Sequence, residues 1–157
     1  MTTHADRVEI LLVEDNPSDE ELTLHAFKTN HILNRMQVVR DGAQALDFVF
    51  ARGAYSSNTV EKGPKLILLD VKLPKVDGLE VLRQIKDDPR TRDIPVVVLT
   101  SSQEEPDLTA AYDRGANSYI VKPVNFEQFS ELMRKVGVYW LLLNKLPLRL
   151  GWAGDRN

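Results

Sequence analysis

The sequence predicts an α/β fold in which a five-stranded parallel sheet carries helices on both of its faces. Five short apolar runs rich in β-branched residues recur along the chain. Each run is continuous instead of alternating with polar residues, which is typical of strands buried on both faces of a parallel sheet. Segments with the spacing of amphipathic helices separate the runs. Strand and helix therefore alternate throughout, as a doubly wound sheet with right-handed crossovers requires.

The strands and helices follow one another in a regular order. The apolar runs place strands at residues 8–13, 36–39, 66–69, 96–99 and 119–121. The helices are marked by apolar residues at helical spacing, namely Leu22 with Ala26; Ala45 and Leu46 with Val49 and Phe50; Leu82 with Ile85; Leu108 with Ala111 and Tyr112; and Phe126 with Phe129 and Met133. The predicted architecture is a flavodoxin-like, three-layer sheet of strand order 2-1-3-4-5, whose ligands bind at the carboxyl ends of the strands.

Helix start signals agree with this order. Asn16-Pro17 precedes the first helix, Asp41 precedes the second, and Asn125 opens the last. A capping box before the fourth helix is formed either by Ser101 with Glu104 or by Ser102 with Glu105.

Length and composition favour a single domain in the cytoplasm. With 157 residues, 43% of them hydrophobic, the chain can bury one core. The absence of cysteine excludes disulfides and suits a reducing compartment. The longest apolar run, residues 138–143, is too short to span a membrane, and the start MTTHADRVEI lacks an export signal. A net charge of −3 with dispersed basic residues argues against nucleic acid as a direct partner.

Two segments fall outside the strand and helix pattern. Residues 52–65 form a long polar connection before the third strand, which we expect to be a surface loop that either contacts a partner or is a tolerated insertion. We expect residues 1–145 to form the domain and residues 146–157 to be a short tail with no effector domain.

Acidic side chains follow two strands that we expect to be neighbours. Glu14 and Asp15 come directly after the first strand, and Asp70 comes directly after the third. Like charges a few ångströms apart repel by about 4 kcal/mol per pair at an effective dielectric near 20, so three carboxylates need a counter-ion. Mg²⁺ prefers oxygen ligands and is commonly held by one or two carboxylates together with phosphate oxygens. The pattern therefore predicts a magnesium site with room for a phosphoryl group.

Two further strands end in groups that bind phosphoryl oxygens. The fourth strand brings the hydroxyl of Thr100 to the same edge of the sheet, and the fifth brings the ammonium of Lys122. A hydroxyl and an ammonium facing Asp70 can bind phosphoryl oxygens while the metal neutralises others. Asp70 would then be the nucleophile that becomes an aspartyl phosphate.

The ordered set of motifs resembles the response-regulator receiver family of two-component signalling, of the chemotaxis-regulator type. The motifs are E-D after the first strand, D-x-x-L-P-x-x-D-G after the third, T-S after the fourth and K-P after the fifth. The resemblance covers residues 8 to about 140. It implies that Asp70 accepts a phosphoryl group from a sensor histidine kinase, with possible autodephosphorylation instead of conventional enzyme activity.

The resemblance also implies individual roles. Glu14, Asp15, Asp70 and the backbone carbonyl of Lys72 hold Mg²⁺, for which Mn²⁺ can substitute. Thr100 and Lys122 bind the phosphoryl group. Thr100 and Tyr119 move together when the group is bound, and this movement changes the surface that contacts partner proteins. A cis peptide bond is implied between Lys122 and Pro123. Asp77-Gly78 matches the turn that closes the loop over the site, Ser101 leaves access to Asp70, and Lys72 and Ser102 tune the phosphoryl lifetime.

Output is expected to pass through protein contacts. The apolar segment VGVYWLLLNKLPL either finishes the core face of the last helix or forms an interface, most simply a homodimer through the C-terminal helix region. The polar connection before the third strand and the YWLLLNKLP segment are similar to small regulators of bacterial phytochrome kinases. A light-sensing histidine kinase is therefore the expected partner.

Three other functions fit the sequence less well. A metal-dependent aspartyl phosphatase generally needs an acid two residues after the nucleophile, where this chain has Lys72. A pseudo-receiver, a binding module without the chemistry, would lack a residue of the site, and none is missing. Nucleotide binding has no support, because neither GxxxxGK nor GxGxxG is present.

Overall fold

The five expected strands form one parallel sheet. The computed structural model describes residues 8–101, 105–122 and 125–143, without the side chains of Glu105, Leu142 and Leu143. The strands are β1 (Ile10–Val13), β2 (Met36–Val39), β3 (Leu66–Leu69), β4 (Val96–Thr100) and β5 (Ser118–Val121). Every pairing is parallel and the order is β2-β1-β3-β4-β5, which confirms the predicted topology.

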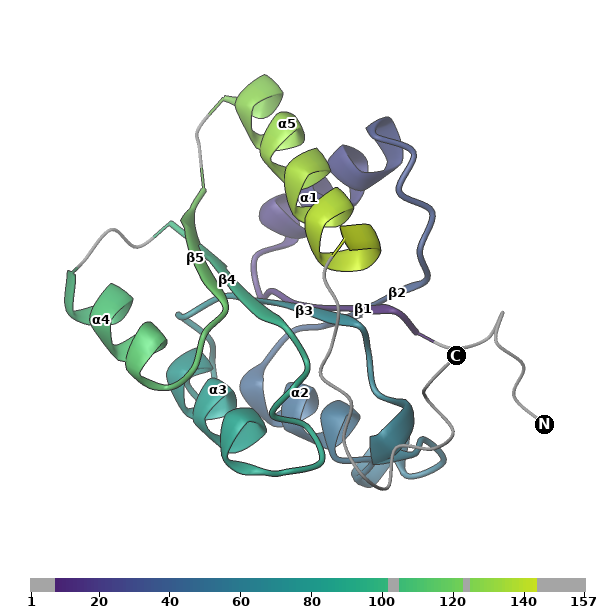
Figure 1. The fold of residues 1–157 in the computed structure, drawn as a ribbon, viewed down its shortest axis with the longest axis vertical. Helices are drawn as coiled ribbons and strands as arrows, with labels where there is room; N and C mark the ends of the chain where they lie inside the picture. Colours follow the sequence, from purple (N-terminus) through teal and green to yellow (C-terminus); the bar gives the residue numbers. More distant parts are fainter. Residues whose placement is uncertain (1–7, 102–104, 123–124, 144–157) are drawn as a thin grey trace.

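Helices cover both faces of the sheet. They are α1 (Pro17–Thr29), α2 (Gly42–Val49), α3 (Gly78–Asp87), α4 (Glu105–Asp113) and α5 (Phe126–Gly137), and α5 continues into a π-helical segment, Val138–Leu143. Figure 1 shows α1 and α5 above the sheet and α2, α3 and α4 below it. The three-layer prediction is confirmed.

Alternate residues of each central strand enter two separate cores. Leu11, Val13, Ile67 and Leu69 belong to the core under α2 and α3, whereas Ile10, Leu12, Leu66 and Leu68 belong to the core under α1 and α5. Successive side chains of a strand point to opposite faces, so a strand that feeds two cores must be apolar at every position. This requirement explains the unbroken apolar runs of β1, β3 and β4, all of whose residues are buried.

Side-chain caps begin three of the helices at the predicted positions. The side chain of Asn16 accepts hydrogen bonds from the backbone N–H groups of Ser18 and Asp19 at the start of α1. Asp41 accepts from Gln44 N at 2.7 Å, and Asn125 accepts from Gln128 N at 3.1 Å. These bonds satisfy donors that the first turn of a helix leaves unpaired. The capping box before α4 involves residues 102–104, which lie outside the described residues.

Some predicted details were wrong. β1 begins at Ile10 instead of residue 8, and the edge strands β2 and β5 are only partly buried. Leu22, expected on the core face of α1, is 42% exposed, because Thr23, Ala26 and Phe27 form that face. On α4, Ala111 is buried but Leu108 and Tyr112 are exposed.

The polar connection before β3 is more ordered than a simple surface loop. It contains two short 3₁₀ turns, Gly53–Tyr55 and Val60–Lys62. Val60 is buried, and the ring of Tyr55 lies edge-on to that of Phe48 with 5.0 Å between centroids. Two apolar side chains therefore attach this largely exposed segment to the domain.

In the segment after α5, some side chains complete the core face of the helix and others are exposed, where an interface could form. Trp140 and Leu141 are partly buried against the core under α1 and α5. Tyr139 is 50% exposed.

Among the described residues, no helix combines the length and apolar character needed to cross a membrane.

The loop between β3 and α3 is held close to the end of β3 by a glycine. The N–H of Gly78 donates to the carbonyl of Val71 at 3.0 Å, and the carboxylate of Asp77 accepts from Leu79 N at 3.0 Å to begin α3. A Cβ atom on Gly78 would overlap the backbone of Asp70 and Val71. The start of α3 thus fixes the backbone directly after the strand.

Replacing Gly78 with alanine should displace the backbone of Asp70 and destabilise the domain. We expect Gly78→Ala to lower the free energy of unfolding by about 2–3 kcal/mol, because backbone atoms cannot yield to the new methyl group. Urea unfolding followed by circular dichroism measures this change. Gly63→Ala is the matched control, since its Cβ would meet atoms at 3.3 Å and its φ is −68°. Equal losses in the two variants would contradict the explanation.

Candidate functional site

The predicted site residues meet at the carboxyl edge of the sheet. Val13 of β1 pairs with Leu69 of β3, so Glu14 and Asp70, the next residues in each strand, lie side by side. Thr100 is the last residue of β4 and pairs with Val121, after which comes Lys122. Parallel strands all end at the same edge, and this register brings four strand ends together as the sequence predicted.

Three carboxylates form a compact cluster. Each of Glu14, Asp15 and Asp70 offers an oxygen that lies within 4.8 Å of the other two. Glu14 and Asp70 are buried, at 2% and 8% exposure, whereas Asp15 is exposed. Carboxylate oxygens at this separation suit a hard divalent cation that keeps some water ligands at the open side.

Asp70 is oriented by two hydrogen bonds to one of its oxygens. The fully buried hydroxyl of Thr100 donates to Asp70 Oδ1 at 3.0 Å, and the backbone N–H of Lys72 donates to the same oxygen at 3.0 Å. The loop after β3 therefore folds back onto the carboxylate. The other oxygen, Oδ2, faces the ammonium of Lys122 at 3.4 Å.

Lys122 is the central cation of the site. Its Nζ lies 2.5 Å from Glu14 Oε2, 3.0 Å from Asp19 Oδ2 and 3.4 Å from Asp70 Oδ2. The side chain of Lys122 is only 9% exposed, so these ion pairs are shielded from water. A shielded ion pair interacts more strongly than one at the surface, where solvent and salt screen the charges.

The electrostatics of the site favour a further positive charge. Burial raises the pKa of Glu14 to about 7, and the charge of Asp70 adds to the rise, while the hydrogen bond and charge of Lys122 offset part of it. Burial alone would lower the pKa of Lys122, but the neighbouring carboxylates outweigh burial and raise it. Lys122 thus stays protonated, and one ammonium does not neutralise all the carboxylates around it.

Other predicted residues are placed as follows. Tyr119 lies in β5, half-buried against the core under α2 and α3, and its N–H donates to the hydroxyl of Tyr112 at 3.2 Å. Ser101 is exposed directly after β4. The ammonium of Lys72 lies 3.4 Å from Asp107 of α4. Pro123 and Ser102 lie outside the described residues.

Asp19 also contacts Lys122, although its place in the sequence does not predict this contact. This residue is in the first turn of α1, where an acid is usually explained by the partial positive charge of the helix N-terminus. In the structure its carboxylate pairs with Lys122, a residue 103 positions later. The only sequence signal was its position four residues after Asp15, one helical turn into a helix that begins at the edge of the sheet.

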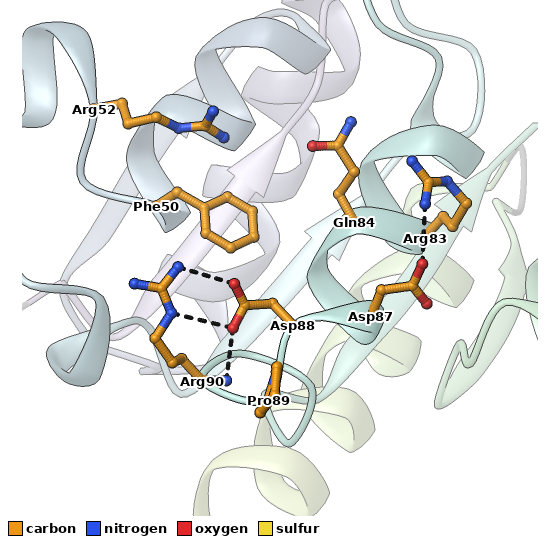
Figure 2. A pocket seen from close by; sticks show the side chains of 8 residues that line it. All are labelled: Phe50, Arg52, Arg83, Gln84, Asp87, Asp88, Pro89 and Arg90. Carbon is orange, nitrogen blue, oxygen red and sulfur yellow. Dashed lines mark hydrogen bonds and ion pairs between the residues drawn. The ribbon is translucent and has the colours of Figure 1, made fainter.

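A hollow elsewhere on the surface is not part of this site. It has a volume of about 560 Å³ and lies between the ends of α2 and α3, whereas the acid cluster lies near the start of α3. Figure 2 shows Arg83 paired with Asp87 and Arg90 with Asp88, each pair with a nitrogen–oxygen distance of 2.9 Å, while Arg52 lies over the ring of Phe50. Most of the charged side chains that line the hollow are therefore neutralised by ion pairs with one another.

Comparisons with known proteins match most of the chain. The model of the response regulator receiver domain family matches residues 10–134. A probable methanogenesis regulatory protein, FilR2 of Methanothrix harundinacea, is 43% identical over 88% of this chain and 86% of its own. Response regulator Rcp1 of Synechocystis sp. is 40% identical over 88% of this chain and 92% of its own.

Solved structures agree with the sequence matches. The phosphorylated cyanobacterial phytochrome response regulator RcpA superposes with a TM-score of 0.82 at 39% identity, covering 90% of this chain and 99% of that one. The Mn²⁺-bound form of Rcp1 superposes with a TM-score of 0.79 at 40% identity, covering 88% and 98%.

Removing the charge of Asp15 should stabilise the domain when no divalent metal is bound. Asp15 repels Glu14 and Asp70, whereas the ion pairs of Lys122 are with Glu14, Asp19 and Asp70 among the described residues. We expect Asp15→Asn to raise the melting temperature by about 3 °C in the presence of a chelator. Glu21→Gln, which removes an exposed charge on α1, is the control. A lower melting temperature for Asp15→Asn would contradict the repulsion argument.

Proposed function

The chain belongs to the response-regulator receiver family, and from this membership we propose that Asp70 is the residue that accepts a phosphoryl group from a sensor histidine kinase. The observation that carries the proposal is the position of the Asp70 carboxylate, which lies at the edge of the sheet among two further acids, a hydroxyl and an ammonium. A carboxylate held in this way can act as a nucleophile toward phosphorus.

The transfer assigns a role to each side chain. A carboxylate oxygen of Asp70 forms a bond to phosphorus while the phosphorus–nitrogen bond of the kinase phosphohistidine breaks, and the imidazole nitrogen keeps the electron pair. Lys122 and Thr100, which already contact Asp70, then bind phosphoryl oxygens. Because the Thr100 hydroxyl exchanges a carboxylate partner for a phosphoryl partner, it can shift, and we propose that Tyr119 moves with it.

A divalent cation completes the site in this proposal. Glu14, Asp15, Asp70 and the backbone carbonyl of Lys72 hold Mg²⁺, and Mn²⁺ can replace it because it also prefers oxygen ligands. When bound, the metal neutralises charge that builds up on the phosphoryl oxygens. The excess of carboxylates over ammonium groups around Asp70 supports this assignment.

The receiver is a signalling domain, and we propose that it accepts a phosphoryl group and can dephosphorylate itself, without conventional enzyme activity. A hydrolytic enzyme of this type would place an acid two residues after Asp70. This chain has Lys72 there, and its ammonium is paired with Asp107. We propose that a cytoplasmic domain of residues 1–145 passes the signal on by protein contacts, without nucleic acid and without a membrane.

We propose a phytochrome-type histidine kinase as the partner. The support is the similarity to RcpA, which is described as a cyanobacterial phytochrome response regulator. FilR2 is instead described as a probable methanogenesis regulatory protein, so kinase specificity needs its own test.

We also propose a homodimer through the C-terminal helix region. Tyr139 is half exposed on the π-helical continuation of α5, and its ring lies edge-on to that of Trp140 with 4.9 Å between centroids. An exposed aromatic on an apolar helical face favours an interface, and two-fold pairing is the commonest arrangement of identical chains.

Phosphorylation by acetyl phosphate should require both Asp70 and a divalent metal. Intact-protein mass spectrometry should find one added phosphoryl group on the natural chain with Mg²⁺, and none on Asp70→Asn or after chelation. Asp47→Asn, which changes an aspartate outside the site, should be phosphorylated normally. Phosphorylation of Asp70→Asn, or none of the natural chain, would contradict the proposal.

Kinase preference tests the proposed partner. We expect transfer from a phosphorylated phytochrome-type kinase to be at least about tenfold faster than transfer from an unrelated histidine kinase, because specificity is a difference in binding free energy between partners. Rapid-quench measurement with labelled phosphate gives both rates. Equal rates would contradict a phytochrome partner while leaving Asp70 as the acceptor.

The dimer is tested by sedimentation velocity. Tyr139→Glu places a charge on the proposed interface and should shift the dimer to monomer, since burying an unpaired charge is unfavourable. Leu108→Glu, at an exposed apolar residue of α4, should leave the dimer intact. Dissociation by Leu108→Glu alone would move the interface to α4.

A further inference from the structure

Within the described part of the chain, Lys122 contacts three carboxylates, of which two belong to the proposed metal site. Glu14 and Asp70 lie in the acid cluster together with Asp15. The third, Asp19, lies outside that group but is 3.0 Å from the ammonium. Neither the family assignment nor the phosphoryl-transfer mechanism above gives Asp19 a role.

The backbone of Asp19 is held at both of its polar groups. Its N–H donates to the side chain of Asn16 at 3.1 Å, and its carbonyl accepts from the hydroxyl of Thr23 at 2.8 Å. Thr23 is fully buried, so this turn of α1 is anchored in the domain. Asp19 therefore carries its carboxylate toward Lys122 from a rigid element instead of a flexible loop.

A divalent cation at Glu14 and Asp70 would compete with Lys122 for the same two carboxylates. Two positive charges on shared carboxylates repel each other, so Lys122 must give up part of its contact with Glu14 when a metal binds. A carboxylate that contacts Lys122 but stands apart from the metal ligands can keep the ammonium in place during this exchange. Asp19 is the carboxylate in that position.

We propose that Asp19 is a positioning residue that holds the ammonium of Lys122 at the site while a divalent cation takes over Glu14 and Asp70. The inference rests on the proposed function, since it assumes that the acid cluster binds metal. Without Asp19, Lys122 depends more on Glu14 and Asp70 and competes more strongly with the metal. Metal affinity should therefore fall, even though Asp19 is not itself a ligand.

The test is isothermal titration calorimetry of the full chain with Mg²⁺, without any phosphoryl donor. We expect Asp19→Asn to weaken Mg²⁺ binding about tenfold, and the matched control Glu21→Gln, an exposed acid on the same helix, to weaken it by about twofold or less through loss of a screened charge. Asp19→Glu, which keeps a carboxylate, should restore most of the affinity.

Repeating the titration in the Lys122→Met variant separates positioning of Lys122 by Asp19 from a direct effect of Asp19 on the metal. In Lys122→Met, where no ammonium competes, Asp19→Asn should weaken Mg²⁺ binding no more than Glu21→Gln does. If circular dichroism finds Lys122→Met unfolded, the same comparison is made with Lys122→Gln. The positioning role is overturned if Asp19→Asn and Glu21→Gln behave alike in the natural chain, or if the tenfold loss persists without Lys122.

The titration also distinguishes this inference from the proposed function. Natural chain that binds Mg²⁺, together with an unchanged Asp19→Asn, rejects the role of Asp19 and leaves the metal site standing. Natural chain that does not bind Mg²⁺ rejects the proposed metal site and this inference with it.

Discussion

The ion pairs of Lys122 hold the functional edge of this domain together. Glu14 and Asp70 are buried next to each other, and burial of two like charges is unfavourable unless a cation lies between them. The ammonium of Lys122 contacts both, and Lys122 lies 108 positions after Glu14 in the sequence. β1, β3 and β5 must therefore all end at the same edge of the sheet, in matching register. The site and the register of the sheet depend on the same contacts.

The remaining architecture serves that placement. The N–H of Lys72 and the hydroxyl of Thr100 fix one oxygen of Asp70, while the other oxygen faces Lys122. Because Gly78 has no Cβ atom, the start of α3 can pack directly against the backbone of Asp70 at the end of β3. A rigid carboxylate with one tethered oxygen is suited to a transfer reaction, in which most of the catalytic benefit comes from positioning and charge.

The same close packing of charges fits the proposed switch. Among the described residues, three carboxylates surround the ammonium of Lys122, and under the proposed function this site would take up a metal and exchange hydrogen bonds when a phosphoryl group binds. Thr100 connects the carboxylate to β4, and Tyr119 of the neighbouring β5 packs into the core under α2 and α3. Under the proposed function, a change in the partner of Thr100 would act on β4 next to the edge strand β5.

The fold, the edge of the sheet and most of the residues that meet there could be predicted from the sequence alone, because strands that feed two cores must be apolar throughout and parallel strands end together. The sequence did not determine which face of α1 is buried, and Leu22 was wrongly placed on the core side. It also did not reveal Asp19, because an acid in the first turn of a helix already has a local explanation. Only the tertiary structure, by packing α1 and α5 on the same face of the sheet and by ending β5 beside β4, brought Lys122 to Asp19. A contact between residues 103 positions apart is set by packing, and periodicity along the chain carries no information about it.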